Sequence, residues 1–207
     1  IRIAEPKLFD EVFINPAASD TGIPLGAALY GFHILGKKPI NSYELSPYLG
    51  PTYEMEEIND AIKNYSNNDT FYCINKGSLK IASKILKNNL ILANFQGRSE
   101  IGPRALGNRS ILMSPMVKEN KDRLNHRVKK RESFRPFAPS VLEDRAIEFF
   151  EMNDKSPYML FICEVKSNKK NLLPAITHID GTARIQTISR AMNEKFYNLI
   201  KTFGDDT

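Results

Sequence analysis

The chain lacks the cysteine patterns and long apolar runs that mark several protein classes. Only two of its 207 residues are cysteines, Cys73 and Cys163, and they form no Cys-x-x-Cys pair, which argues against structural zinc and a disulfide framework. No run approaches the ~20 apolar residues that span a membrane, and no signal peptide, internal repeat or low-complexity tract is visible. We therefore expect a cytoplasmic globular protein without a membrane segment.

Two further absences concern catalysis and the chain ends. No nucleophilic triad is legible, because Ser110 and Ser133 have no histidine partner nearby. The sequence begins at Ile1 without a methionine and stops at Thr207, just after a helical pattern where another strand would be natural. We expect it to be a fragment of a longer chain.

The charges that are present are unevenly distributed. Residues 97–135 hold eleven Lys and Arg against four Asp and Glu, a net charge of +7, whereas the whole chain carries +5 and the remainder therefore −2. A positive field confined to one stretch favours an anionic ligand, whether nucleic acid, a nucleotide or a small phosphorylated substrate. For some lysines a solvated helix surface explains the charge equally well: Lys118, Lys121 and Lys130.

The loop from Gly97 to Ser110 is the strongest candidate for binding that anion. It follows an apolar run at residues 90–95 that predicts a buried strand, and it contains three glycines, one proline and three arginines. Glycines let the backbone approach a ligand closely, and the guanidinium group offers a planar set of donors for phosphate or carboxylate oxygens. The alternative is a surface loop with scattered charges. The three arginines are Arg98, Arg104 and Arg109.

Two more segments have the composition of ligand sites. In residues 124–140, Arg135 stands among two phenylalanines and two prolines, a frame that we expect to hold its side chain rigidly for a small anion. The alternative is an arginine at the edge of the core, neutralised by an internal acid.

In residues 178–187, His178 is either a base or simply hydrogen-bonded beside a turn. Asp20, before a helix, is either a metal ligand or a cap or turn residue.

The periodicity of the chain predicts an α/β or α+β mixed fold. Five prolines and glycines between residues 36 and 53 suggest a linker between domains: Gly36, Pro39, Pro47 and the pair Gly50-Pro51. The turn signal at Asp180-Gly181 predicts a hairpin of residues 175–179 and 183–188, with Arg184, Gln186 and Ile188 on one face. The other expected elements are a strand at 12–14 and another at 158–165, and helices at 25–31, 55–65, 78–88, 119–130, 143–150 and 196–203.

Four of these runs together resemble the carbamoyltransferase family that includes the NodU nodulation and the CmcH and TobZ antibiotic-tailoring O-carbamoyltransferases. They occur in the order found in that family, which makes the set far more specific than any one loop. The runs are Pro16-Ala-Ala-Ser-Asp-Thr-Gly22 with Leu25-Gly-Ala-Ala-Leu29, then residues 97–112, 128–142 and 178–187.

This resemblance implies a fold and a reaction. Residues 1–38 would be the tail of an actin/sugar-kinase-like domain, and residues 39–207 a YrdC-like domain, a twisted mixed sheet flanked by helices and cut short at its end. Carbamoyl phosphate and ATP would form carbamoyl-adenylate there. The carbamoyl group would then pass to a hydroxyl of a small acceptor, a sugar or another natural product, in the first domain. A divalent metal, iron or magnesium, would be bound mostly by residues upstream of this sequence.

The resemblance also implies roles for individual residues. The phosphate and carbamoyl groups would be held by Arg104, Lys129, Arg135 and Arg184, and Asp20 matches the metal-binding aspartate of the family. Asn108, Arg109 and His178 would assist in binding substrate or nucleotide, although Asn108 and Arg109 could instead only shape the loop.

Some parts of the family pattern are not in this sequence. Its histidine metal ligands lie upstream, and its Asn-Thr-Ser-Phe-Asn motif follows the last helix, so we expect this chain alone not to complete catalysis. One alternative is an RNA-binding YrdC-like module without transferase activity, and another is a regulatory or structural fragment. RNA is disfavoured because the arginines lie in compact loops without alternating aromatic platforms.

Overall fold

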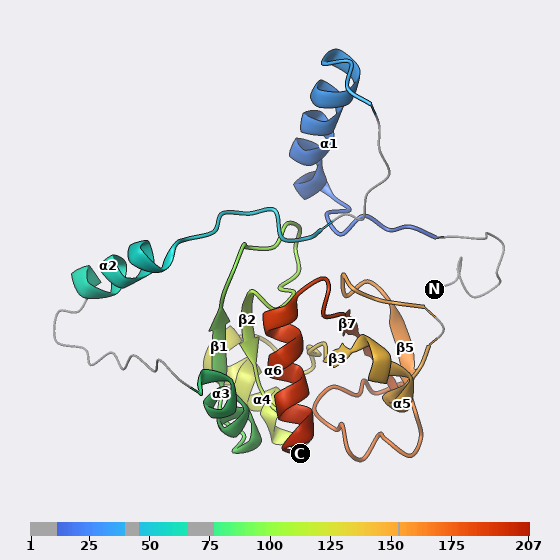
Figure 1. Cartoon of the computed structure of the whole chain (residues 1–207). Coiled ribbons are helices and arrows are strands. Elements are labelled where there is room, and N and C mark those ends of the chain that lie inside the picture. Colours follow the sequence, from blue (N-terminus) through green and yellow to red (C-terminus); the bar gives the residue numbers. More distant parts are fainter. Residues whose placement is uncertain (1–11, 40–45, 66–76, 153) are drawn as a thin grey trace.

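The computed structural model describes residues 12–39, 46–65, 77–152 and 154–207, and it mixes helices and strands as the sequence predicts (Figure 1). No helix in these ranges has both the length and the apolar character to cross a membrane. The α-helices are α1 (Ile23–Tyr30), α2 (Met55–Tyr65), α3 (Ser78–Lys87), α4 (Glu119–Leu124), α5 (Ala146–Phe149) and α6 (Glu194–Asp205). Shorter 3-10 or π turns are η1 (Asp20–Gly22), η2 (Gly31–Leu35), η3 (Asn125–Lys129) and η4 (Glu143–Arg145).

The described strands form three small sheets. The first is an antiparallel pair, β1 with β2, and the second a parallel pair, β3 with β7. The third is antiparallel in the order β4-β5-β6. The strands are β1 (Leu92–Phe95), β2 (Arg109–Leu112), β3 (Ser140–Leu142), β4 (Phe150–Glu151), β5 (Ile162–Val165), β6 (Thr182–Arg184) and β7 (Gln186–Ile188).

Ile185 is the residue at which the chain leaves one sheet and enters another. It follows β6, precedes β7 and is completely buried. It packs in a cluster with Phe150 and Val165 from the neighbouring strands of the third sheet. A second cluster places Phe196 and Leu199 of α6 against Ile188 at the end of β7. Burial of these side chains holds the two sheets and α6 together.

The helices near the N-terminus contribute little to this core. Neither α1 nor α2 has a buried residue, and Figure 1 shows both projecting away from the part of the molecule that contains the sheets. A Cβ added to Gly26 of α1 would meet no atom within 4 Å, so the small residues of this helix are not used for close packing here. The domain boundary predicted near residue 38 adjoins residues 40–45, which lie outside the described ranges, and it stays a prediction.

Most of the expected helices are confirmed, and two expected strands are wrong. The prediction of a strand at residues 12–14 fails, because this segment has no regular structure. Residues 175–179 form turns instead of a strand, since the N–H groups of Ile176 and Thr177 donate to the carbonyl of Leu173. The Asp180-Gly181 turn is present, but the partner of β6 is β5.

The predicted single strand of residues 183–188 is also wrong, because β6 ends at Arg184 and β7 begins at Gln186. Arg184 is half-buried, whereas Gln186 and Ile188 are fully enclosed. Strand alternation requires one continuous strand in one sheet, and this strand is interrupted at Ile185. Arg184 and the other two residues therefore belong to different sheets, and a face shared by all three stays a prediction.

We expect Gly107→Ala to be strongly destabilising. Gly107 has a φ of +116°, and a Cβ there would overlap the ring of Phe196. The backbone strain and the displaced ring should lower the free energy of unfolding by about 2–4 kcal/mol. Urea unfolding measures this, with Gly26→Ala as the control, which should change stability by less than about 1 kcal/mol. Equal effects of the two substitutions would contradict the packing described here.

Candidate functional site

The loop between β1 and β2 is organised around one carboxylate, that of Glu100. Its Oε1 accepts hydrogen bonds from the N–H groups of Leu106 at 2.8 Å, Asn108 at 2.8 Å and Arg109 at 3.2 Å. Bonds to an ionised acceptor are about twice as strong as neutral ones, so this group holds the returning half of the loop. The sequence reading missed Glu100, although it is the only acid between Gly97 and Ser110.

Asn108 connects this loop to the start of α6. Its Nδ2 donates to the carbonyl of Arg98 at 2.7 Å, and its Oδ1 accepts from Gln96 at 3.0 Å and from Asn193 at 2.8 Å. The Oδ1 of Asn193 in turn accepts from the N–H of Phe196 and caps α6. Both polar atoms of the buried Asn108 side chain are thus used in shaping the loop.

Two of the three loop arginines also hold the loop itself. The guanidinium of Arg109 donates to the carbonyls of Gln96 at 2.7 Å and Gly97 at 3.1 Å, and it lies over the ring of Phe95 at 3.6 Å. Arg98 donates to the carbonyls of Leu49 and Gly50. Arg104 differs, because its Nε is buried and has no hydrogen-bond partner in the described part of the chain.

The carbonyl of Leu106 attaches the loop to the second sheet. It accepts from the hydroxyl of Tyr48 and from Nε2 of Gln186, each at 2.9 Å. The Oε1 of Gln186 accepts from the hydroxyl of Ser140 on β3. Burial raises the pKa of Tyr48, so this hydroxyl remains a donor. Leu106 lies two positions after Arg104, and Gln186 two positions after Arg184. The hydrogen bond between Gln186 and the Leu106 carbonyl therefore brings the segments of the two arginines together.

Two other arginines, Arg104 and Arg131, lie close enough to Arg184 for their charges to act on it. Burial lowers the pKa of Arg184, and the charges of Arg104 and Arg131 lower it further. None of the three forms an ion pair with an acid among the described residues. Arg131 is positioned by a bond from its Nε to Oδ1 of Asn125 at 2.7 Å and by the ring of Phe137 at 4.7 Å. Partly desolvated cations without acidic partners favour an anionic ligand, which makes these arginines the candidate site.

Arg131 was missed, and the neighbouring basic residues that the resemblance selected are placed differently. Arg135 was expected inside a rigid apolar frame, but its side chain is 54% exposed and pairs with Glu132 at 3.9 Å. Phe134 of that frame is 75% exposed, so it does not enclose the arginine. Lys129, the last residue of η3, is exposed as well. Arg131 lies between Lys129 and Arg135 in the sequence, and this position is the only feature of the sequence that could have suggested it as a site residue.

His178 lies at the turn before β6 and keeps one ring nitrogen free. Its Nδ1 is 3.0 Å from Oγ1 of Thr182, whose hydroxyl donates to Oδ1 of Asp180 at 2.7 Å. Its Nε2 is buried and has no partner among the residues that the structure describes. Burial lowers the pKa of His178, the charge of Arg184 lowers it too, and Asp180 acts in the opposite direction.

Asp20 lies in η1, exposed to solvent, next to a turn in which Oγ of Ser19 accepts from the N–H of Thr21. In the described ranges no three His, Cys, Asp or Glu side chains gather closely enough to hold a metal ion. The described residues do not form a metal site by themselves, so Asp20 as a ligand stays a prediction. Pro16, shortly before Asp20, packs closely against Gly102 of the loop between β1 and β2. A Cβ on Gly102 would lie only 2.6 Å from the carbonyl oxygen of Pro16.

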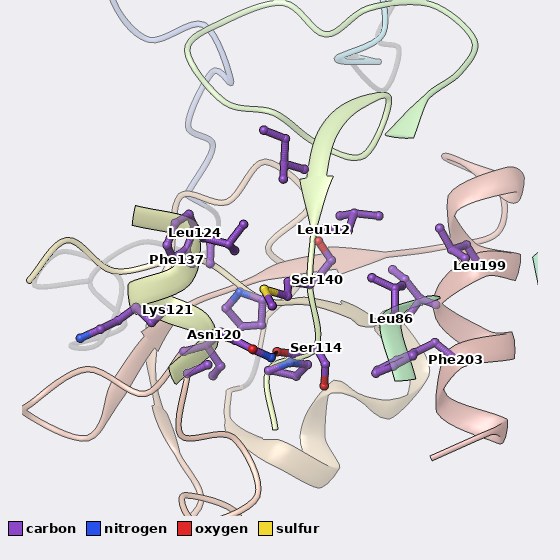
Figure 2. Close-up of a pocket in the computed structure, with 18 of the residues that line it drawn as sticks. Leu86, Leu112, Ser114, Asn120, Lys121, Leu124, Phe137, Ser140, Leu199 and Phe203 are labelled. Carbon is purple, nitrogen blue, oxygen red and sulfur yellow. Dashed lines mark hydrogen bonds between the residues drawn. The ribbon is translucent and has the colours of Figure 1, made fainter. Parts of the chain in front are cut away.

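A separate cavity of about 160 Å³ lies between β2, β3, α3, α4 and α6 (Figure 2). Its walls are mainly apolar, with Leu86, Leu199 and Phe203 on one side and Leu124 and Phe137 on the other. Polar side chains are few in this lining, and none of the three clustered arginines belongs to it. The cavity is therefore no candidate for the anion.

Comparison with known proteins gives a consistent result. Residues 83–207 match the family described as "Carbamoyltransferase C-terminus". The chain is 45% identical over 203 residues to the nodulation protein NolO of Bradyrhizobium diazoefficiens, covering 97% of this chain and 37% of that protein. It is 43% identical to the nodulation protein NolNO of Sinorhizobium fredii, a match that covers 100% of this chain and 31% of that protein. It is 38% identical to nodulation protein U of B. diazoefficiens, a match that covers 95% of this chain and 32% of that protein. The chain thus spans about a third of these relatives.

We expect Glu100→Gln to destabilise the protein by roughly 1–3 kcal/mol, because three backbone N–H groups lose their ionised acceptor. Thermal unfolding measures the change. Glu151→Gln is the control, since Glu151 is exposed on β4, and it should alter stability by less than about 0.5 kcal/mol. If both variants unfold like the wild type, the carboxylate does not organise the loop.

We expect Arg184→Ala to weaken binding of inorganic pyrophosphate about ten- to hundredfold, because a charge-assisted contact to the anion is lost. Isothermal titration calorimetry gives the dissociation constants. Lys195→Ala, an exposed cation on α6, should stay within about twofold of the wild type. An unchanged affinity of Arg184→Ala would place the anion elsewhere.

Proposed function

Because the chain belongs to the carbamoyltransferase C-terminal family, we propose that its three clustered arginines bind carbamoyl phosphate and ATP. The observation that supports this most directly is that the charges of Arg104 and Arg131 act on the half-buried Arg184, while none of the three has an ion pair with an acid among the described residues. Carbamoyl phosphate, ATP and pyrophosphate are all anions with oxygens that match guanidinium donors. The unpartnered Nε of Arg104 is a donor available for such an oxygen.

The proposed reaction forms carbamoyl-adenylate. Water first cleaves the bond between the carbamoyl group and the phosphate of carbamoyl phosphate, which gives carbamate and inorganic phosphate. A carbamate oxygen then bonds to the α-phosphorus of ATP, and pyrophosphate leaves as the bond from the α-phosphorus to the bridging oxygen breaks. Fixed cations stabilise the charge that develops on both leaving groups, because they are already oriented before the reaction. We assign this role to Arg104 and Arg184, with Arg131 as the third cation.

The remaining predicted residues have secondary roles in this proposal. Lys129 and Arg135, which are exposed, would contact phosphate oxygens at the rim of the site, and Asn108 and Arg109 maintain the loop. Asp20 would act as one metal ligand together with residues outside this sequence. The carbamoyl acceptor would be a small hydroxyl-bearing molecule, a sugar or another natural product.

Binding of RNA is the competing function, and one observation favours it. The exposed side chains of η3 and the residue after it form a basic surface. Affinity for RNA falls steeply as salt rises, whereas a pocket for a small ligand responds far less. A titration of both ligands at several salt concentrations separates the two functions. The basic residues are Arg127, Lys129 and Lys130.

We expect the complete protein, supplied with carbamoyl phosphate and ATP, to release phosphate and pyrophosphate in equal amounts and to form carbamoyl-adenylate. Arg104→Ala should reduce the rate about a hundredfold or more, because one preorganised donor to the developing charge is lost. Coupled assays of the two products and mass spectrometry of the adenylate measure this, with Lys195→Ala as the control at wild-type rate. Absence of both products under every metal condition would refute the proposed function.

A further inference from the structure

We propose that Nε2 of His178 accepts a hydrogen bond from the amino group of carbamoyl phosphate and thereby selects it over acyl phosphates that lack an N–H. This inference rests on the proposed function and adds the group that distinguishes the substrate. The buried Nε2 has no partner among the described residues. The charge of Arg184 acts on His178, and the charge of Arg104, whose buried Nε is also unpartnered, acts on Arg184.

The hydrogen bonds around His178 fix the position of its proton. Thr182 has a single hydroxyl hydrogen, and Oδ1 of Asp180 can only accept when the carboxyl is ionised. The side-chain and backbone hydrogen bonds from Thr182 lower the pKa of Asp180 and keep it ionised. The hydroxyl of Thr182 therefore donates to Asp180 and must accept from Nδ1 of His178. A neutral His178 thus carries its proton on Nδ1 and presents the lone pair of Nε2.

His178 and Arg184 lie on the same side of the third sheet. Ala183 points into the core and is completely buried, so its neighbours Thr182 and Arg184 point to the opposite face. His178 bonds the side chain of Thr182 and is thereby held on that face as well. His178 and Arg184 are thus positioned to contact one ligand in this proposal.

The chemistry of the ligand calls for such an acceptor. Guanidinium groups only donate hydrogen bonds, so the arginines match phosphate and carbonyl oxygens but not an amino group. Carbamoyl phosphate carries an –NH₂ where acetyl phosphate carries a methyl group, and the two are otherwise nearly alike in charge and size. A buried acceptor that finds no N–H remains unpaired, which penalises acetyl phosphate.

The test compares dissociation constants of carbamoyl phosphate and acetyl phosphate in the complete protein. We expect the wild type to prefer carbamoyl phosphate about tenfold or more. His178→Phe should reduce the preference to within about twofold, and His178→Gln, whose amide oxygen replaces Nε2, should restore most of it. Thr182→Val removes the acceptor that holds the ring proton of His178 on Nδ1, so it should lower the preference for carbamoyl phosphate several-fold. Ile179→Ala, next to His178 but fully exposed, should leave it unchanged.

Each outcome decides the inference. A preference that survives in both His178→Phe and Thr182→Val overturns it, and so does a wild type that binds the two compounds equally, although the proposed function then stands. A wild type that binds neither compound refutes the proposed function and this inference with it. Thermal unfolding and the affinity for ATP confirm that the variants are folded. If His178→Phe does not fold, Thr182→Val and His178→Gln carry the comparison.

Discussion

Three backbone N–H groups converge on one oxygen of Glu100, and the geometry of the site depends on that convergence. The chain leaves β1, forms an irregular loop and returns into β2, and no regular ladder is available to satisfy the amides on the way. An ionised carboxylate supplies the missing acceptor from inside the loop. The carbonyl of Leu106 is thereby left to face the second sheet, and Arg104 is carried to the neighbourhood of Arg184.

The arginine cluster is arranged at a cost to stability that an anion can offset. Like charges in a partly desolvated place repel one another, and the described residues provide no carboxylate for them. Asn125, Phe137 and the Glu100 loop instead hold the guanidinium groups by neutral contacts and backbone bonds. Such an arrangement keeps the cations unpaired and oriented before a ligand arrives, which is the condition for strong electrostatic stabilisation of a reacting phosphate.

Sequence periodicity predicted most helices, because apolar residues at helical spacing mark the face that is buried. It failed at residues 175–179, where local turn bonds from the Leu173 carbonyl replace a strand, and at residues 12–14, whose apolar character was mistaken for a strand pattern. The mixed α+β class was within reach of the sequence, because it depends on composition and spacing, which are local properties. Binding of an anion by the loop stays a prediction.

The details of the site were beyond that reach, since they depend on contacts between distant segments. Nothing in the local sequence of Arg131 distinguishes it from Lys129 or Arg135. Its position depends on contacts with Asn125, Pro136 and the ring of Phe137, and its charge acts on Arg184. In the same way, the free Nε2 of His178 results from the turn and from Thr182 acting together.

The crossing of the chain at Ile185 links the proposed anion site to two sheets. Arg184 is the last residue of β6 and Gln186 the first of β7, so Arg184 lies two positions from the residue whose side chain joins the loop to β7. An anion bound at Arg184, as proposed, would therefore restrain two sheets and the loop at once. Protection from hydrogen exchange should rise together in β3, β6 and β7, although β3 supplies none of the clustered arginines.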